Sequence, residues 1–157
     1  MNSHDDLYSI QEDGTGLATL ADTTNFEEFQ AITPSNRVIF ARIVGSQRDL
    51  YSVNADGTGL VALSTSLLSD EFFAVAANER VLFRREPAPF QFDLYSVKAD
   101  GTGLVTLANS ADMESFAGTT PDGKVIFARQ VGGAQNDVYI VNADGTGLQP
   151  LSNTAND

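Results

Sequence analysis

The sequence contains no cysteine, no tryptophan and a single histidine, His4. Without cysteine it can form neither a disulfide framework nor a thiolate metal site. A Ser-His-Asp triad needs an imidazole held in place by the fold, and transition-metal sites usually need His or Cys ligands. Because His4 lies so close to the N-terminus, we expect no catalytic residue and no metal ligand of this kind.

Basic residues are also scarce, since nine Lys and Arg face twenty-one Asp and Glu, for a net charge of −12. Such a field repels nucleic-acid phosphates and anionic lipid headgroups, so we expect no nucleic-acid partner. Cationic ligands, metal ions or basic protein patches are favoured, although acidity also serves solubility. No apolar run is long enough to span a bilayer, and "MNSHDD" lacks the features of a secretory signal. Membrane insertion is therefore not expected, and the compartment stays open.

One turn is written four times in a chain whose 157 residues suit a single domain, residues 1–157. "VNADGTGL" occupies residues 53–60 and 141–148, and close relatives begin at Ile10 and Val97. Successive turn glycines lie 43, 44 and 44 residues apart, and the segments "RVIF", "RVLF" and "KVIF" keep the same step. The chain therefore consists of internal repeats of about 44 residues.

Each repeat predicts four short strands, A to D, rich in Val, Ile, Leu, Phe and Tyr. Several strands are apolar at consecutive positions, which requires sheets stacked on sheets, and this predicts an all-β fold of β-propeller blades. The repeated "DGTG" predicts a type I turn closed by a glycine with positive φ, and it lacks the ligands of a calcium loop or a phosphate cradle. The predicted structural turn residues are Asp13, Gly14, Asp56, Gly57, Asp100, Gly101, Asp144 and Gly145.

The segment "PDGKVIF" at residues 121–127, together with "D-[LV]-Y" before "ADGTGL" and a following "L-[ST]", resembles the propeller repeat of TolB-type proteins. This resemblance covers residues 6 to 152. It implies a binding platform, of a kind found alone or beside catalytic domains, and only the resemblance suggests a periplasmic or extracellular location. "VAANER" replaces "TPDGK" in the middle repeat, which predicts an irregular inner turn there.

The repeats add up to about three and a half blades. Residues 6–20 form only strands C and D, and complete blades span residues 26–64, 69–108 and 113–152. Closed propellers need about four to eight blades, and an open arc would expose apolar sheet faces. We therefore expect a homodimer, or another closed oligomer, that completes the ring. The rival interpretation is a fragment or an engineered partial propeller with no function of its own.

Charges recur where strand A begins, at Glu27, Glu28, Asp70, Glu71 and Glu114. If the ring brings these carboxylates together, a cation or basic group must compensate them, and calcium is the candidate ion. Arg42, Arg85 and Arg129 end strand B, and Asp6, Asp49, Asp93 and Asp137 open strand C. The simplest expectation for these two sets is a weak ion pair across each B–C hairpin, such as Arg42 with Asp49.

The middle repeat departs from its sisters in its B–C connection, where "REPAPFQF" contains Phe90 and Phe92 and follows Arg84. These three residues are candidates for ligand contact, although the phenylalanines could equally pack over the rim or onto a neighbouring chain. The function we expect is a non-catalytic module that binds a protein, peptide or glycan on its loop-rich face. The alternative is a propeller enzyme that uses carboxylates alone, such as a glycosidase or lyase.

Overall fold

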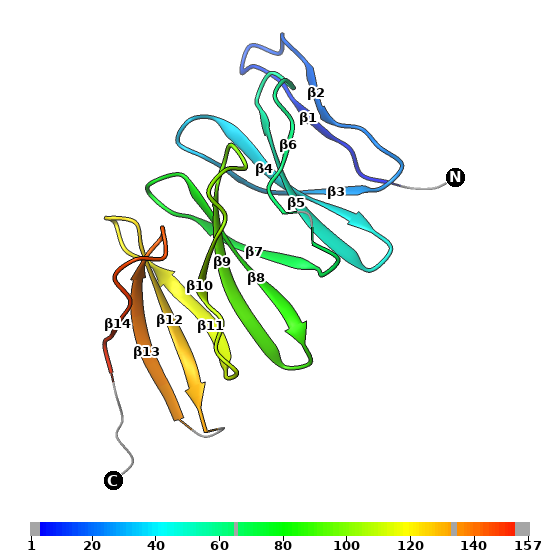
Figure 1. Cartoon of the computed structure of the whole chain (residues 1–157). Helices are drawn as coiled ribbons and strands as arrows, with labels where there is room; N and C mark the ends of the chain where they lie inside the picture. Colours follow the sequence, from blue (N-terminus) through cyan, green and yellow to red (C-terminus); the bar gives the residue numbers. More distant parts are fainter. Residues whose placement is uncertain (1–3, 65, 133–134, 153–157) are drawn as a thin grey trace.

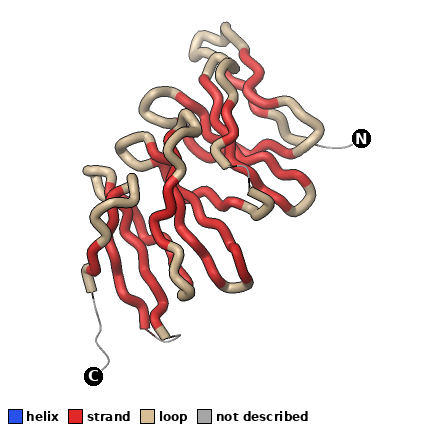
Figure 2. Tube along the Cα trace, viewed as in Figure 1, coloured by secondary structure: helices blue, strands red, loops and turns tan. Residues whose placement is uncertain are grey.

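A computed structural model describes residues 4–64, 66–132 and 135–152, so both ends of the predicted domain, residues 1–3 and 153–157, lie outside the described residues. The described residues form four antiparallel sheets that follow one another in a row along the chain (Figures 1 and 2). No helix occurs among them, and thus none long and apolar enough to cross a membrane. The predicted all-β propeller-blade architecture is confirmed.

The first sheet is a half blade, and the other three are complete blades with strand order A, B, C and D. Blade 1 contains only strands C and D, β1 (Leu7–Ser9) and β2 (Ala18–Ala21). Blade 2 consists of β3 (Phe26–Ile32), β4 (Arg37–Val44), β5 (Gln47–Asn54) and β6 (Val61–Ala62). Blade 3 consists of β7 (Asp70–Val75), β8 (Arg80–Ala88), β9 (Gln91–Lys98) and β10 (Val105–Ala108). Blade 4 consists of β11 (Met113–Thr119), β12 (Lys124–Val131), β13 (Gln135–Asn142) and β14 (Gln149–Pro150).

The repeated C–D turn has the predicted geometry. In blade 2, the Gly57 N–H donates to the Asn54 carbonyl at 2.9 Å, and Gly57 has φ 83°. The Asp56 carboxylate also accepts bonds from the backbone N–H and the hydroxyl of Thr58, at 2.9 and 2.6 Å. The same Asp–Thr bonds recur in the other three turns, so the threonine of "DGTG" fixes the loop together with the glycine.

The predicted irregularity of the inner turn in blade 3 is wrong. Its A–B turn closes with the Glu79 N–H donating to the Ala76 carbonyl at 2.9 Å, as the sister turns close through Asn36 and Gly123. Glu79 takes the left-handed conformation, with φ 62°, that Gly123 takes with φ 83°. The backbone therefore keeps the turn although "VAANER" has no glycine, at a conformational cost of about 1–2 kcal/mol.

Neighbouring blades pack through buried apolar layers. The strand-B phenylalanines Phe40, Phe83 and Phe127 are fully buried, and each faces the preceding sheet. Hydrogen bonds cross the same interfaces, because a serine of strand C donates to a backbone carbonyl in the turn of the next blade. These bonds join Ser9 to Ala55, Ser52 to Ala99 and Ser96 to Ala143.

Both ends of the row leave apolar side chains exposed. In blade 4, Leu151 is 56% exposed, whereas its counterparts Leu63 and Leu107 are 3% and 6% exposed. In blade 1, Ile10 is 59% exposed, whereas its counterpart Val53 is fully buried. At each end of the arc, apolar side chains are therefore exposed at positions that are buried between blades elsewhere in the described residues.

Candidate functional site

The strand-A carboxylates lie in three buried ion pairs, one in each complete blade. Glu27, Asp70 and Glu114 are 3%, 0% and 0% exposed. Each accepts a hydrogen bond from the Nε of the arginine near the end of strand B in the same blade. The pairs are Arg42 with Glu27 at 2.9 Å, Arg85 with Asp70 at 2.8 Å and Arg129 with Glu114 at 3.0 Å.

The expected pairing of these arginines across the B–C hairpin is therefore wrong. Arg42 and Asp49 are partners in the backbone register of β4 and β5, but the Arg42 guanidinium bonds to Glu27 on β3. Burial alone does not explain this choice, because Asp93 and Asp137 on strand C are also buried, at 6% exposed each, although the strand-A carboxylates are buried most completely. The arginine also supplies the compensation that our cation hypothesis assigned to calcium.

Each of these arginines also lies over a stacked aromatic pair. Arg42 Cζ is 4.6 Å from the centroid of Tyr51, whose ring stacks on Phe40 at 5.5 Å. The same arrangement recurs with Tyr95 in blade 3 and Tyr139 in blade 4. The aromatic faces stabilise the cation and exclude water from the ion pair. This unit of arginine, carboxylate and two rings is therefore a structural element of every complete blade.

Burial raises the pKa of Asp70, and the hydrogen bonds from Arg85 and Ser64 oppose that shift. Asp49 of the preceding blade adds a smaller upward contribution to the Asp70 pKa. Arg85 nevertheless holds both Asp70 oxygens, at 2.8 Å to Oδ1 and 3.2 Å to Oδ2. Asp70 is thus occupied by a partner and not available as a simple cation ligand.

Between blades 2 and 3, a pocket of about 530 Å³ opens where a B–C connection meets a D–A connection. The Ser69 hydroxyl donates to the Ser46 carbonyl at 3.0 Å and accepts from the Arg48 N–H at 3.1 Å, which ties the two connections together. The pocket is lined by Ser46, Arg48, Ser69, Asp70, Glu71, Arg84, Glu86 and Phe92. Four of our predicted ligand-binding residues, Asp70, Glu71, Arg84 and Phe92, therefore meet at one place.

The charged groups in this pocket form ion pairs with one another but remain partly exposed to solvent. Arg84 Nε donates to Glu71 at 2.7 Å, and its guanidinium lies 4.2 Å from the centroid of the Phe92 ring. The Glu71 side chain remains 55% exposed. Arg48 pairs in the same way with Glu28 of blade 2, at 2.8 Å, and the Glu28 side chain is 52% exposed. The pocket can therefore offer cations, carboxylates and an aromatic edge to a ligand.

Phe90 lies beside this pocket in an unusual conformation. It is 83% exposed, and its backbone N–H donates to Glu86, a residue of the pocket wall, at 3.0 Å. Its φ of 64° is left-handed, whereas the left-handed residues in the B–C hairpins of the sister blades are the glycines Gly45 and Gly132, which lie at other positions of the turn. A large aromatic residue in this region is an outlier with a conformational cost of about 1–2 kcal/mol. The exposed ring does not repay that cost by packing in the core.

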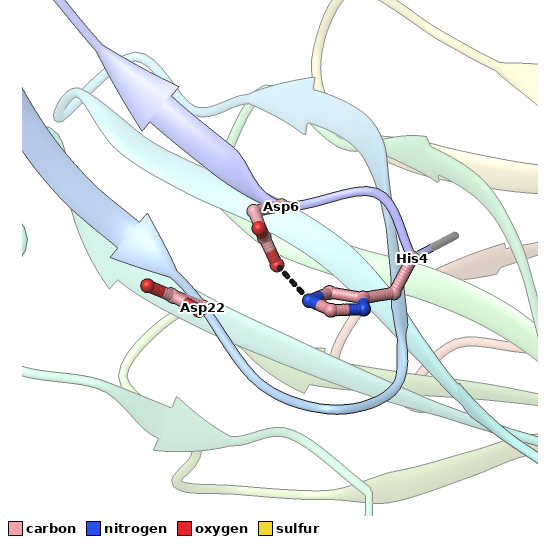
Figure 3. A group of neighbouring side chains, drawn as sticks. All are labelled: His4, Asp6 and Asp22. Carbon is pink, nitrogen blue, oxygen red and sulfur yellow. Dashed lines mark ion pairs between the residues drawn. The ribbon is translucent and has the colours of Figure 1, made fainter. Parts of the chain in front are cut away.

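His4 lies beside the strand-C aspartate of the half blade. Its Nε2 lies 3.7 Å from the Oδ1 atom of Asp6 (Figure 3). Asp22, which follows β2, completes a group whose potential ligand atoms all lie within 4.8 Å of one another. Sequence reasoning missed this group, although the signal was present: His4 stands two residues before the strand-C aspartate, where every complete blade has glutamine.

No family model matches the sequence, and no curated protein matches it either. Among solved structures, the chain is similar to dipeptidyl peptidase 4 from Porphyromonas gingivalis, with a TM-score of 0.70 and 11% identity. That similarity covers 92% of this chain and 22% of the peptidase. A TolB-type protein from Agrobacterium tumefaciens is similar with a TM-score of 0.58 and 17% identity, over 82% of this chain and 49% of that protein. The chain thus spans at most about half the length of these structures, and it shares with them the β-propeller fold.

Proposed function

We propose that the chain is a non-catalytic β-propeller module that binds a protein, peptide or glycan at the pocket between blades 2 and 3. The observation that carries this proposal is Phe90, an exposed aromatic residue in a strained conformation whose backbone N–H donates to Glu86 of the pocket wall. Strained backbone conformations concentrate at functional sites, where the cost is kept because the side chain is needed. The pocket volume is also within the range of ligand sites.

The sister blades supply matched variants for a test. Arg84 corresponds to Ala41, and Phe92 corresponds to Asn136, so Arg84→Ala and Phe92→Asn restore residues that the same fold already carries. Phe90→Gly removes the ring and the conformational cost together. We expect all three to leave the thermal midpoint within a few degrees of wild type.

Binding is measured on a random peptide library and on a glycan array, and hits are confirmed by calorimetry with the same peptide or glycan. We expect a hit from one panel whose affinity falls at least about tenfold in the Phe90→Gly variant. If no hit appears on either panel, or if all three variants bind as wild type does, the proposal is wrong. Turnover of an array glycan that disappears in Glu71→Gln would instead support the carboxylate-only enzyme.

A second candidate function is self-association that completes a ring, and the exposed end face of blade 4 supports it. Leu151 is exposed on this face, although its counterparts in blades 2 and 3 are buried. Ile126 and Val138 are only half-buried, whereas their counterparts are fully buried. Ile140 stands where Ser52 and Ser96 bond to the next blade, so this face offers apolar area without that hydrogen-bond donor. Faces of this kind drive association.

Sedimentation of wild type at micromolar concentration tests this candidate directly. We expect a dimer or larger closed oligomer that Leu151→Glu converts to monomer. Leu67→Glu is the control, because Leu67 is 94% exposed in the connection between blades 2 and 3 and lies away from the end face. A wild-type monomer, or an oligomer that survives Leu151→Glu, would contradict ring completion through this face.

A further inference from the structure

The half blade carries a group of side chains that the complete blades lack. In blade 2, Gln47 Nε2 donates to Asp49 at 3.1 Å and to the Ser66 carbonyl at 2.8 Å. In blade 3, Gln91 makes the corresponding bond to the Ser110 carbonyl at 3.1 Å. This neutral amide thus ties strand C to the D–A connection in both blades.

Two substitutions change the chemistry of that tie in blade 1. His4 replaces the glutamine, two residues before Asp6, in the spacing that Gln47 keeps with Asp49. Asp22 follows Leu20 by two residues, where the other three repeats have the neutral residues Thr65, Asn109 and Asn153. The pair of changes replaces an amide and a neutral side chain by an imidazole and a second carboxylate.

We propose that His4, Asp6 and Asp22 bind a divalent transition-metal ion of the zinc type. The three residues supply one imidazole nitrogen and two carboxylate oxygens, which is a donor set that Zn²⁺ accepts with water in the fourth position. Tetrahedral bonds to zinc place ligand atoms roughly 3.4 Å apart. The His4 and Asp6 atoms already lie 3.7 Å apart, and all three ligand atoms lie within 4.8 Å, so small side-chain rotations complete the site.

The state of Asp6 is a second observation that points to a cation. Its Oδ1 atom is inaccessible to solvent and accepts no hydrogen bond within the described part of the chain, and the His4 Nε2 atom lies 3.7 Å from it. Such an oxygen carries a desolvation cost that a bound metal ion would remove.

The proposal differs from the calcium hypothesis in both place and chemistry. Calcium prefers six to eight oxygen ligands, whereas this group offers a nitrogen and few oxygens. None of the three residues lines the pocket between blades 2 and 3, so the metal-site proposal can be tested independently of the proposed ligand.

The test uses Zn²⁺ alone, on the full chain without a histidine tag. Because His4 is the only histidine of the sequence, its imidazole NMR signals report binding without ambiguity. We expect these signals to shift with one equivalent of Zn²⁺, and the thermal midpoint to rise by about 5–10 °C when Zn²⁺ exceeds its Kd a hundredfold.

His4→Gln restores the residue of the complete blades, and Asp22→Asn restores the residue at position 109, so both variants should fold. We expect His4→Gln to weaken Zn²⁺ binding at least about a hundredfold and Asp22→Asn at least about tenfold. Ca²⁺ should leave the imidazole signals and the midpoint unchanged. Unshifted His4 signals at 1 mM Zn²⁺ (roughly a thousandfold above a micromolar Kd), or equal Zn²⁺ affinity in wild type and His4→Gln, would overturn the proposal.

Discussion

Replacing Arg85 by methionine should be among the most damaging single changes in the molecule. The substitution keeps the apolar stem under Tyr95 but removes both hydrogen bonds to Asp70, at 2.8 and 3.2 Å. The Asp70 side chain is 0% exposed and the Arg85 side chain 12% exposed, so the carboxylate would be left charged without solvent or partner. Breaking such a buried pair on one side costs about 3–5 kcal/mol.

Arg84 provides the control on the adjacent residue of the same strand. Its partner Glu71 is 55% exposed, so water can replace the guanidinium, and Arg84→Ala should cost about 0–1 kcal/mol. In a domain of this size, each kcal/mol corresponds to about 2–4 °C in the thermal midpoint. We therefore expect Arg85→Met to lower the midpoint by about 6–20 °C and Arg84→Ala by at most about 4 °C.

Urea unfolding followed by circular dichroism measures these differences, and the absence of tryptophan leaves tyrosine fluorescence as the second probe. Adding Asp70→Asn to Arg85→Met should recover part of the loss, because the buried charge is then gone. The loss should also shrink as the pH falls from 7 toward 4. The reason is that burial already raises the Asp70 pKa, and a carboxyl with a raised folded-state pKa destabilises the fold only while it is ionised. Equal losses for Arg85→Met and Arg84→Ala would refute the reasoning.

Three further changes test other parts of the fold. Gly57→Ala should lower the free energy of unfolding more than Gly14→Ala does, although both glycines have φ near 80°. The new methyl group would lie 2.5 Å from a backbone oxygen of blade 1 at position 57, whereas at position 14 it would meet nothing within 4 Å. Urea midpoints of the two variants measure this difference. Ser96→Ala should cost about 1–3 kcal/mol in the same assay, since it leaves a buried carbonyl of blade 4 without its donor. Asp56→Asn should destabilise the chain at pH 7, because hydrogen bonds from Thr58 lower the Asp56 pKa below 3.8 in the folded state. This contribution is lost as the pH falls from 3.8 through the lowered folded-state pKa, so a stability difference that does not shrink on acidification would contradict the prediction.

The sequence was sufficient to predict the blades because the information that specifies them is local. Hairpin turns such as residues 54–57 depend on a glycine with positive φ, and strand faces depend on alternating or continuous apolar residues. Repetition then gave several independent copies of each signal. The failure at "VAANER" is instructive, since Glu79 adopts a conformation that its residue type disfavours because the surrounding blade imposes it.

The partners of the charged residues could not be predicted in the same way. Arg42 has two acidic neighbours at similar sequence distance, Glu27 across one hairpin and Asp49 across the other. Which one it binds depends on how the side chains pack between neighbouring blades. Packing of this kind is a property of the stacked sheets and cannot be predicted from the spacing of either hairpin.

Departures from the repeat locate function better than the repeat itself, because a position that the fold alone determines should be alike in every blade. The arginine, carboxylate and aromatic unit recurs in blades 2, 3 and 4, so packing accounts for it. Phe90 is left-handed, as glycines are at other positions of the sister B–C hairpins, and His4 stands where the complete blades have a glutamine. The conformational cost at Phe90 and the change of side-chain chemistry at His4 have no counterpart in the sister blades, so packing does not account for them, and a ligand at the pocket and a metal ion at the half blade are the explanations that we propose.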